Sequence, residues 1–223
     1  MARISWCIAE SAIGVITGEC GSGKTVAARA AVAGLDASRH TTLYLGTPGV
    51  GLRGMYGAIV AGLGGLPRFH AASLIPQTQD LLAAESAERG KAVTVVVDES
   101  HLLDADTLEG LRCLSNAGMD AVAPFSLLLL GQPTLRRRLR LGAFAALDQR
   151  VGLRYAISGL EENETGPYIA HHLKQALLTE LLPGNPSLRT GTCVTVPVDG
   201  RRAAHLAGAG FAGASPARSA AGY

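Results

Sequence analysis

Eight residues near the amino terminus decide the fold: Gly18-Glu19-Cys20-Gly21-Ser22-Gly23-Lys24-Thr25. They match the pattern GxxxxGK[ST] in full, and they lie between an apolar, strand-like run at residues 13–17 and an Ala-rich helical pattern at residues 25–35. Glycines let backbone N–H groups turn inward around phosphate oxygens, and the start of the following helix favours negative charge. The stretch therefore predicts a loop that binds the phosphates of a nucleotide.

Two side chains of this loop have predicted roles. Lys24 would reach the β- and γ-phosphates as a catalytic cation, and the Thr25 hydroxyl would coordinate Mg²⁺. The 20 basic residues comprise 17 Arg and only 3 Lys, and one of these lysines occupies the position that needs a compact point charge. The pattern disfavours the alternative, a glycine-rich turn without a ligand.

The composition is that of a globular chain with balanced charge. Its 223 residues carry a formal charge of +2, and 48% are hydrophobic but only 4% aromatic. These values exclude a strongly basic nucleic-acid-binding tail and an acidic disordered protein. No apolar stretch approaches the roughly 18 residues of a membrane helix, so we expect no membrane segment. The four cysteines, Cys7, Cys20, Cys113 and Cys193, are far apart and form no CxxC pair, which favours the reducing cytoplasm.

Apolar runs alternate with helical patterns from about residue 13 to residue 180. Further strands are expected at 42–45, 92–97, 125–130 and 151–157, and further helices at 52–63, 73–89, 106–114, 135–141, 144–149 and 161–178. The run at 92–97 is uniformly apolar and β-branched, which is typical of a strand buried on both faces. The alternation predicts an α/β fold with a parallel sheet flanked by helices.

Two helices carry more specific expectations. The segment from Ile4 to Ile8, which includes Trp6, is expected to pack as a helix against the sheet. Asp106 is expected to cap the helix at 106–114, because Glu109 three residues later would complete a capping box.

A second acidic site follows the strand at 92–97. Asp98, at the carboxyl end of that strand, would hold the Mg²⁺ shell, and Glu99 would polarise the water that attacks the γ-phosphate. An ordinary acidic helix cap is the alternative, and the phosphate loop makes it less favoured. A carboxylate beside the metal-binding acid indicates ATP hydrolysis, and the lack of an NKxD segment disfavours a GTPase.

Two later polar residues are further candidates for catalysis. Gln132 follows the strand at 125–130, where its amide could meet the γ-phosphate or the attacking water. A turn-forming role before Pro133 is an equal alternative. Arg150 precedes the last strand and could act on the nucleotide of a neighbouring subunit, with a surface ion pair as its alternative.

Four motifs, TGECGSGKT, VVVDESHLL, LLLLGQPTLRRRLRL and LDQRVGLRYAISGLEENETGPYIAHHL, resemble those of AAA+ ATPases of the general secretion pathway protein A type. That group includes ATP-binding helper subunits encoded beside transposases. The resemblance covers roughly residues 2–178. It implies a five-stranded AAA+ core, ATP and Mg²⁺ as cofactors, and hydrolysis between subunits. By position, Lys24 and Thr25 match Walker A, Asp98 and Glu99 match Walker B, Gln132 matches sensor 1 and Arg150 the arginine finger.

The sequence departs from this family after residue 178. The Gly-x-Pro-Arg motif of the helical lid is not found there, and residues 182–223 hold 4 of the 10 prolines and a single acid, Asp199. Only residues 193–198 suggest a short strand. We expect a nucleotide-binding core at 1–160, the start of a largely missing helical lid at 161–181, and an atypical, poorly ordered tail at 182–223, consistent with a truncated or frameshifted reading frame.

Three functional hypotheses follow. The first is an oligomeric, ATP-hydrolysing helper of DNA transposition, with a transposase and double-stranded DNA as partners. The arginines at 136–138 and 140 would then contact DNA phosphates, or alternatively acids of a neighbouring subunit. The second is a secretion-associated ATPase, and the third a truncated nucleotide-binding remnant with little turnover. His101 could approach the active site, with a supporting or capping role.

Overall fold

The computed structural model describes residues 2–46, 48–116, 124–180, 194–198 and 202–206. They belong to two compact units, Met1–Gly159 and Leu160–Tyr223. The first unit contains the phosphate loop and both acidic candidates.

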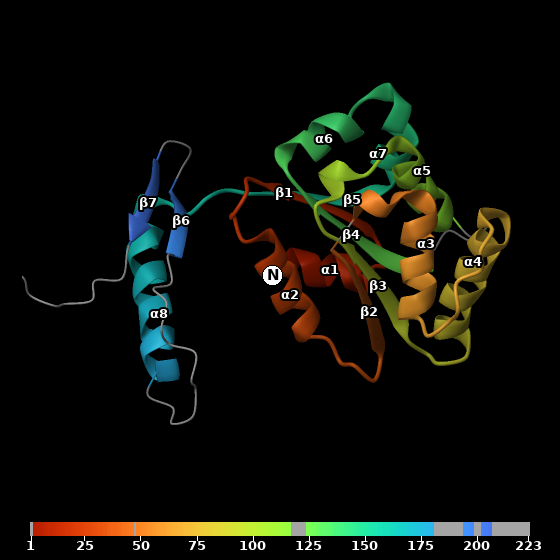
Figure 1. Ribbon diagram of the computed structural model, residues 1–223, viewed down its shortest axis with the longest axis horizontal. Helices are drawn as coiled ribbons and strands as arrows, with labels where there is room; N and C mark the ends of the chain where they lie inside the picture. Colours follow the sequence, from red (N-terminus) through yellow and green to blue (C-terminus); the bar gives the residue numbers. More distant parts are fainter. Residues whose placement is uncertain (1, 47, 117–123, 181–193, 199–201, 207–223) are drawn as a thin grey trace, which may run out of the picture. The chain divides into compact units, whose positions relative to one another are not determined.

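A parallel five-stranded sheet forms the centre of the first unit (Figure 1). Its strands are β1 (Ile13–Gly18), β2 (His40–Leu45), β3 (Ala92–Val97), β4 (Phe125–Gly131) and β5 (Val151–Ile157), in the order β2-β3-β4-β1-β5. All four pairings are parallel. The prediction of a parallel, five-stranded α/β core is therefore confirmed.

Helices cover both faces of this sheet. They are α1 (Ala2–Ala9), α2 (Lys24–Ala33), α3 (Gly51–Gly62), α4 (Ala71–Ala87), α5 (Ala105–Leu114), α6 (Pro133–Leu139) and α7 (Ala145–Arg150), with 3₁₀ turns η1 (Pro48–Val50), η2 (Ser100–Leu102) and η3 (Gly142–Phe144). Residues of α1 and α2 pack in one core cluster, and residues of α3 to α7 pack in a second, larger one. The sheet is thus the middle of three layers.

The central strand β4 shows why helices pack on both faces of the sheet. Phe125, Leu127 and Leu129 lie in the larger cluster, whereas Leu128 and Leu130 lie in the smaller one. This alternation follows from the two-residue period of a strand. Each fully buried leucine contributes about 1.5–3 kcal/mol through the hydrophobic effect, so β4 anchors both layers.

The first helix packs against the sheet as expected, but without its tryptophan. In α1 the buried side chains are Ile4, Cys7 and Ile8, whereas Trp6 is 48% exposed. A residue one position before Cys7 points about 100° away from it on a helix, so Trp6 lies outside the buried stripe. The small Cys7 takes the position against the sheet.

A close approach at Gly14 fixes how α1 lies on the sheet. A Cβ at Gly14 would lie 2.8 Å from Cys7 Sγ and 3.0 Å from Leu128 Cδ2. The Cys7 thiol donates to Ala12 O at 3.3 Å. Burial raises the pKa of the Cys7 thiol to about 11, so this group is uncharged at neutral pH.

The residue that caps helix α5 lies two positions earlier than the sequence suggested. Asp104 is the N-cap residue, and its carboxylate accepts a hydrogen bond from Thr107 N at 2.7 Å. The prediction that Asp106 is the cap is wrong. Asp106 lies within the first turn, where the helix dipole also favours an acid, and sequence spacing alone does not separate these two uses of aspartate.

The second unit contains a helix and a hairpin in its described parts. They are α8 (Glu162–Glu180) and the antiparallel pair β6 (Val194–Val198) and β7 (Arg202–Leu206), in which Val194 pairs with Leu206. The remainder of the tail at 182–223, which the sequence suggested to be poorly ordered, lies outside the described residues. No helix in the described parts combines the length and the apolar character needed to cross a membrane.

The capping assignment predicts that Asp104→Ala destabilises the protein by about 1 kcal/mol, and Asp106→Ala by less. Urea unfolding followed by circular dichroism measures both. Hydrogen bonding to Thr107 holds the pKa of Asp104 below its usual value, so the extra stability is fully present above the usual pKa of an unfolded aspartate and is lost as the pH falls through the lowered pKa of the folded state. Equal losses in the two variants at neutral pH would contradict the assignment.

Candidate functional site

The carboxyl ends of β1, β3 and β4 meet at one edge of the sheet (Figure 1). Thr17 of β1 pairs with Gly131 of β4, and Val97 of β3 pairs with Leu129 of β4. The phosphate loop, the Asp98-Glu99 pair and Gln132 therefore leave the sheet side by side. In parallel α/β sheets this edge is where ligands bind.

The backbone of the phosphate loop has the conformation that its glycines permit. Gly21 and Gly23 have φ of 79° and 84°, in the left-handed region that other residues avoid. Gly23 is the N-cap of α2, and no side chain caps this helix start. The first N–H groups of α2 are thus available to an anion. The buried Ser22 Oγ also lacks a hydrogen-bond partner within the described residues.

Lys24 lies inside this loop. Its side chain is almost fully buried, and its ammonium donates to Gly18 O at 2.9 Å and to Glu19 O at 2.8 Å. No acidic side chain in the described parts pairs with it. A buried cation held only by carbonyl oxygens retains a strong electrostatic preference for an anion, which the phosphates of a nucleotide would satisfy.

Asp98 forms the second half of the site. Its carboxylate is 4% exposed and accepts hydrogen bonds from the Thr25 hydroxyl at 2.6 Å and the Tyr44 hydroxyl at 2.9 Å, both on Oδ2. Its Oδ1 accepts from Glu99 N at 2.8 Å. The direct contact with Thr25 brings the two predicted metal ligands together.

These groups fit a magnesium ion. Mg²⁺ prefers hard oxygen ligands and is usually bound by one or two protein groups together with substrate phosphates and water. Asp98 and Thr25 offer a carboxylate and a hydroxyl beside the phosphate loop. Within the described residues the Asp98 carboxylate has no cationic partner, so a buried negative charge is available to a metal.

Tyr44 is a site residue that sequence reasoning missed. It lies near the end of β2, where it pairs with Val96 on β3, two residues before Asp98. Burial and the hydrogen bond to Asp98 raise the pKa of the Tyr44 phenol, so it remains a donor at neutral pH. Tyr44 lies close to Asp98 because β2 pairs with β3, and the local sequence does not reveal this pairing.

Glu99 leaves β3 with an unusual backbone. Its φ is 49° and its ψ is 33°, in the left-handed region, and its side chain is 48% exposed. Its Oε2 lies 3.4 Å from His101 Nδ1. Gln132 is the N-cap position of α6, and its side chain makes no capping hydrogen bond. Within the described residues neither side chain forms a hydrogen bond, and both follow strands that end at the edge with the phosphate loop.

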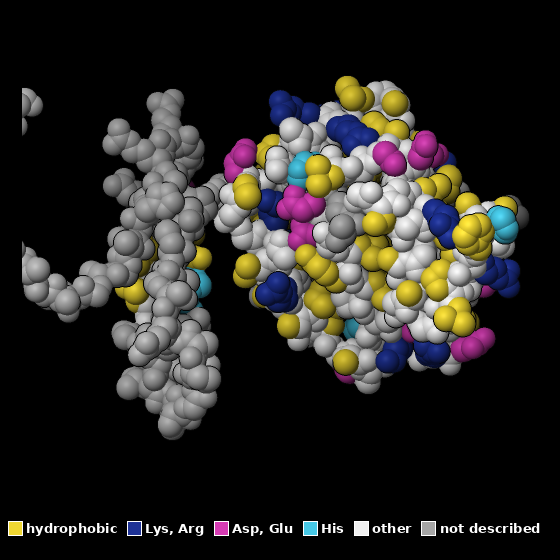
Figure 2. All heavy atoms as spheres, viewed as in Figure 1, with side chains coloured by type: hydrophobic (Ala, Val, Ile, Leu, Met, Phe, Trp, Pro, Cys, Tyr) yellow, Lys and Arg dark blue, Asp and Glu magenta, His cyan; other side chains and the backbone are white. Residues whose placement is uncertain are grey.

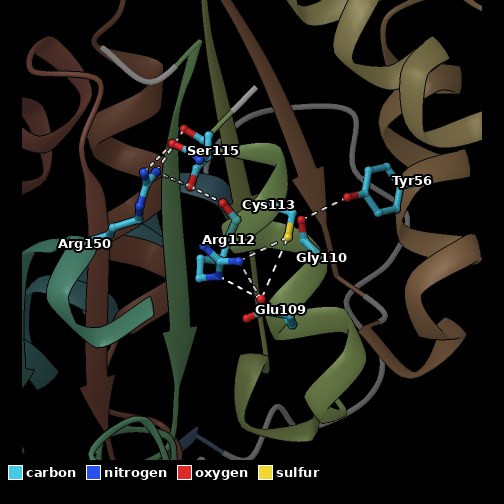
Figure 3. Close-up of polar contacts among 8 residues, drawn as sticks. Tyr56, Glu109, Gly110, Arg112, Cys113, Ser115 and Arg150 are labelled. Carbon is cyan, nitrogen blue, oxygen red and sulfur yellow. Dashed lines mark hydrogen bonds and ion pairs between the residues drawn. The ribbon is translucent and has the colours of Figure 1, made fainter. Parts of the chain in front are cut away.

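Arg150 lies at the opposite edge of the sheet. It is the last residue of α7 and immediately precedes β5, whose first residue pairs with Ile13 at the start of β1. Six strand residues separate this row from the phosphate loop, about 20 Å. Arg150 instead donates to Ser115 O at 3.3 Å and to Asn116 Oδ1, after the end of α5 (Figure 3).

The arginines of α6 do not form one continuous free face. Arg136, Arg137 and Arg140 are exposed and have no acidic partner in the described parts, and Figure 2 shows basic side chains gathered over α6. Arg138 instead donates to Leu103 O and lies over the Phe144 ring at 5.3 Å. One of the four arginines is thus a structural residue.

An apolar hollow adjoins the phosphate loop. Its volume is about 250 Å³, and its lining comes from α1, α2, β1 and β5: Ala2, Arg3, Ile4, Ile16, Ala27, Leu153, Tyr155 and Ile157. The Arg3 guanidinium lies 4.6 Å from the centre of the Tyr155 ring. Ile157 O is only 2.7 Å from where a Gly18 Cβ would stand, so the hollow begins at the start of the loop.

Comparison with known proteins defines the class. A family model described as an AAA domain matches residues 8–139, more than half of the chain. The chain therefore belongs to the AAA family of P-loop ATPases. Within that family it is 32% identical over 165 residues to general secretion pathway protein A of Aeromonas hydrophila, which supports the resemblance seen in the motifs. The match covers 73% of this chain and 30% of that protein, so the chain spans less than a third of this curated relative.

Solved structures share the fold at low identity. The Aeropyrum pernix ORC2 protein, in ADPNP and ADP complexes, has a TM-score of 0.60 at 16% identity, covering 78% of this chain and 50% of that one. The Aeropyrum pernix ORC1 protein in complex with DNA has a TM-score of 0.63 at 13% identity, covering 78% and 48%. At these identities the likeness establishes the fold alone.

Proposed function

We propose that this chain binds ATP with Mg²⁺ and hydrolyses the nucleotide in the cytoplasm as a subunit of a homo-oligomer. The observation that carries the proposal is the meeting of Lys24, Thr25, Asp98 and Glu99 at one sheet edge, where Thr25, the residue after a buried cation, donates a hydrogen bond to a buried carboxylate. A carboxylate that follows the metal-binding acid is the group that hydrolysis requires and that binding alone does not.

Each residue has a distinct part in this reaction. The loop amides and Lys24 would hold the phosphates, and Asp98 and Thr25 would hold Mg²⁺, which neutralises charge on the phosphate oxygens. Glu99 would accept the proton of the attacking water, and Gln132 would orient that water or the γ-phosphate. The hollow between α1 and β5 would take the adenine, because its lining is apolar and it begins at Gly18.

The test of this proposal is Glu99→Gln. Steady-state hydrolysis should fall by about 10²–10⁴-fold, the usual share of general-base catalysis, while a fluorescent ATP analogue still binds. Lys24→Ala should lose binding as well. Glu88→Gln, which removes an exposed acid at the end of α4, serves as the matched control and should hydrolyse ATP normally.

The outcomes separate the catalytic proposal from its alternative. Equal hydrolysis in wild type and Glu99→Gln would refute the role of Glu99. Nucleotide binding without turnover in the wild type would instead support the nucleotide-binding remnant.

Arg150 supports action between subunits. The sheet separates it from its own phosphate loop by about 20 Å, so any contact with a γ-phosphate has to be made on a neighbouring copy. The contacts with Ser115 and Asn116 hold the side chain at the surface of its own subunit. We therefore propose that Arg150 completes the site of the next subunit.

Mixing two inactive variants tests this arrangement. Arg150→Ala should reduce hydrolysis by about 10³-fold or more, as loss of an arginine finger does, and Lys24→Ala should be inactive alone. A mixture should regain activity, because the Lys24→Ala subunits supply Arg150 to intact phosphate loops. Arg154→Ala, which removes an arginine paired with Asp148, is the control. A mixture with no more activity than the Arg150→Ala variant would exclude action between subunits.

For the biological role we propose a helper of DNA transposition that acts with a transposase on double-stranded DNA. The exposed Arg136, Arg137 and Arg140 support it, because these cations lie on or directly after one short helix and have no acidic partner among the described residues. A solved structure with the same fold also contains DNA. The alternative is a secretion-associated ATPase, which the relative's name favours.

Salt-dependent DNA binding discriminates between these roles. Replacing Arg136, Arg137 and Arg140 by alanine should weaken binding to a DNA duplex and reduce the slope of log affinity against log salt by about 2–3, since each phosphate contact contributes about 0.9. The control removes the same charge elsewhere, at Arg39, Arg68 and Lys91, which form no ion pair among the described residues. Equal losses of DNA affinity in both triple variants would contradict a DNA-binding role for the arginines at 136, 137 and 140. If the wild-type protein does not bind DNA and DNA does not accelerate its ATP hydrolysis, the secretion-associated ATPase is the favoured role.

A further inference from the structure

His101 holds a buried polar atom that has no hydrogen-bond partner in the described parts of the chain. Its side chain is 13% exposed, and its Nδ1 is fully enclosed. Burying a ring nitrogen without a partner is unfavourable, so such an atom in a native structure needs an explanation. The group within reach is the Glu99 carboxylate, whose Oε2 lies 3.4 Å away, about half an ångström beyond a good hydrogen bond.

The backbone brings these two side chains together. The left-handed conformation of Glu99 starts the η2 turn, in which Leu102 N donates to Glu99 O at 2.9 Å. The Ser100 hydroxyl donates back to Val97 O at 2.7 Å and fastens the turn to β3. Residues two apart therefore face one another, which a regular helix would not allow.

The end of β4 fixes His101 from the other side. A Cβ at Gly131 would lie 3.2 Å from His101 N, so the backbone of His101 packs directly against the residue before Gln132. Glu99, in contrast, has a half-exposed side chain, and within the described residues no other donor reaches its carboxylate. A largely buried imidazole thus stands beside a half-exposed carboxylate.

We propose that His101 is a positioning residue for Glu99: its Nδ1–H donates to Oε2 and holds the carboxylate in the orientation that receives the proton of water. This proposal deepens the proposed ATP hydrolysis and rests on it. It assigns His101 to turnover and not to nucleotide binding, because its contacts are with Glu99 and Gly131 and not with the phosphate loop.

Steady-state kinetics of three substitutions test the proposal. His101→Ala should lower kcat about tenfold, less than Glu99→Gln, and leave the KM for ATP within about twofold. His101→Asn should restore most of kcat, because its amide places a donor where Nδ1 stands. His101→Gln places its donor at the position of the other ring nitrogen and should not restore it. His70→Ala, at an exposed histidine before α4, is the control and should be unchanged.

Coupling to Glu99 distinguishes positioning from general damage. In the Glu99→Gln background, His101→Ala should cause no further loss, since the two residues act as a unit. A further loss of the same factor in that background, or an unchanged kcat in His101→Ala, would overturn the proposal.

A spectroscopic readout does not depend on hydrolysis. The ¹⁵N resonance of His101 Nδ1, assigned with His101→Asn, should shift in Glu99→Ala and remain in place in Glu88→Gln. If the wild type hydrolyses no ATP, the proposed function fails, yet this shift still tests the contact. An identical Nδ1 resonance in wild type and Glu99→Ala would overturn the role of His101.

Discussion

The candidate site depends on one buried negative charge, the carboxylate of Asp98. An ionised carboxylate is costly to bury unless hydrogen bonds or a cation compensate it. Here hydroxyl groups from α2 and β2 and the amide of the next residue provide the compensation. These bonds connect the helix after the phosphate loop to two neighbouring strands. They stabilise the carboxylate in the way that a bound metal ion would. The same charge thus orders the site and would attract a metal ion.

Much of this arrangement can be predicted from local sequence. The phosphate loop is recognisable because its glycines and its lysine are required within eight residues, and the run at 92–97 is too apolar for anything but a central strand. Two consecutive acids directly after that strand are then expected at the carboxyl edge of the sheet, where the phosphate loop also lies. The parallel sheet and the meeting of Lys24, Thr25 and Asp98 follow from such short-range signals.

The parts that sequence did not reveal depend on contacts between distant segments. Tyr44 joins the site because β2 pairs with β3, and nothing near residue 44 indicates that pairing. Arg150 forms hydrogen bonds with Ser115 and Asn116, 35 and 34 positions earlier in the chain, and nothing near residue 150 in the sequence indicates these partners. Local errors had a different cause. Asp104 and Asp106 both suit a helix start, and only the backbone at Asp104 determines which one caps α5.

The close contact between Cys7 of α1 and Gly14 of β1 also affects the shape of a cavity. Gly14 lies inside a strand, buried under Cys7, and the lack of a side chain there determines how deeply α1 settles on the sheet. The same helix supplies Ala2, Arg3 and Ile4 to the hollow beside the phosphate loop. A single methyl group added at residue 14 would push α1 away from the sheet and so change the depth of this hollow. A buried residue that cannot contact a ligand therefore determines the depth of the cavity in which a base would lie.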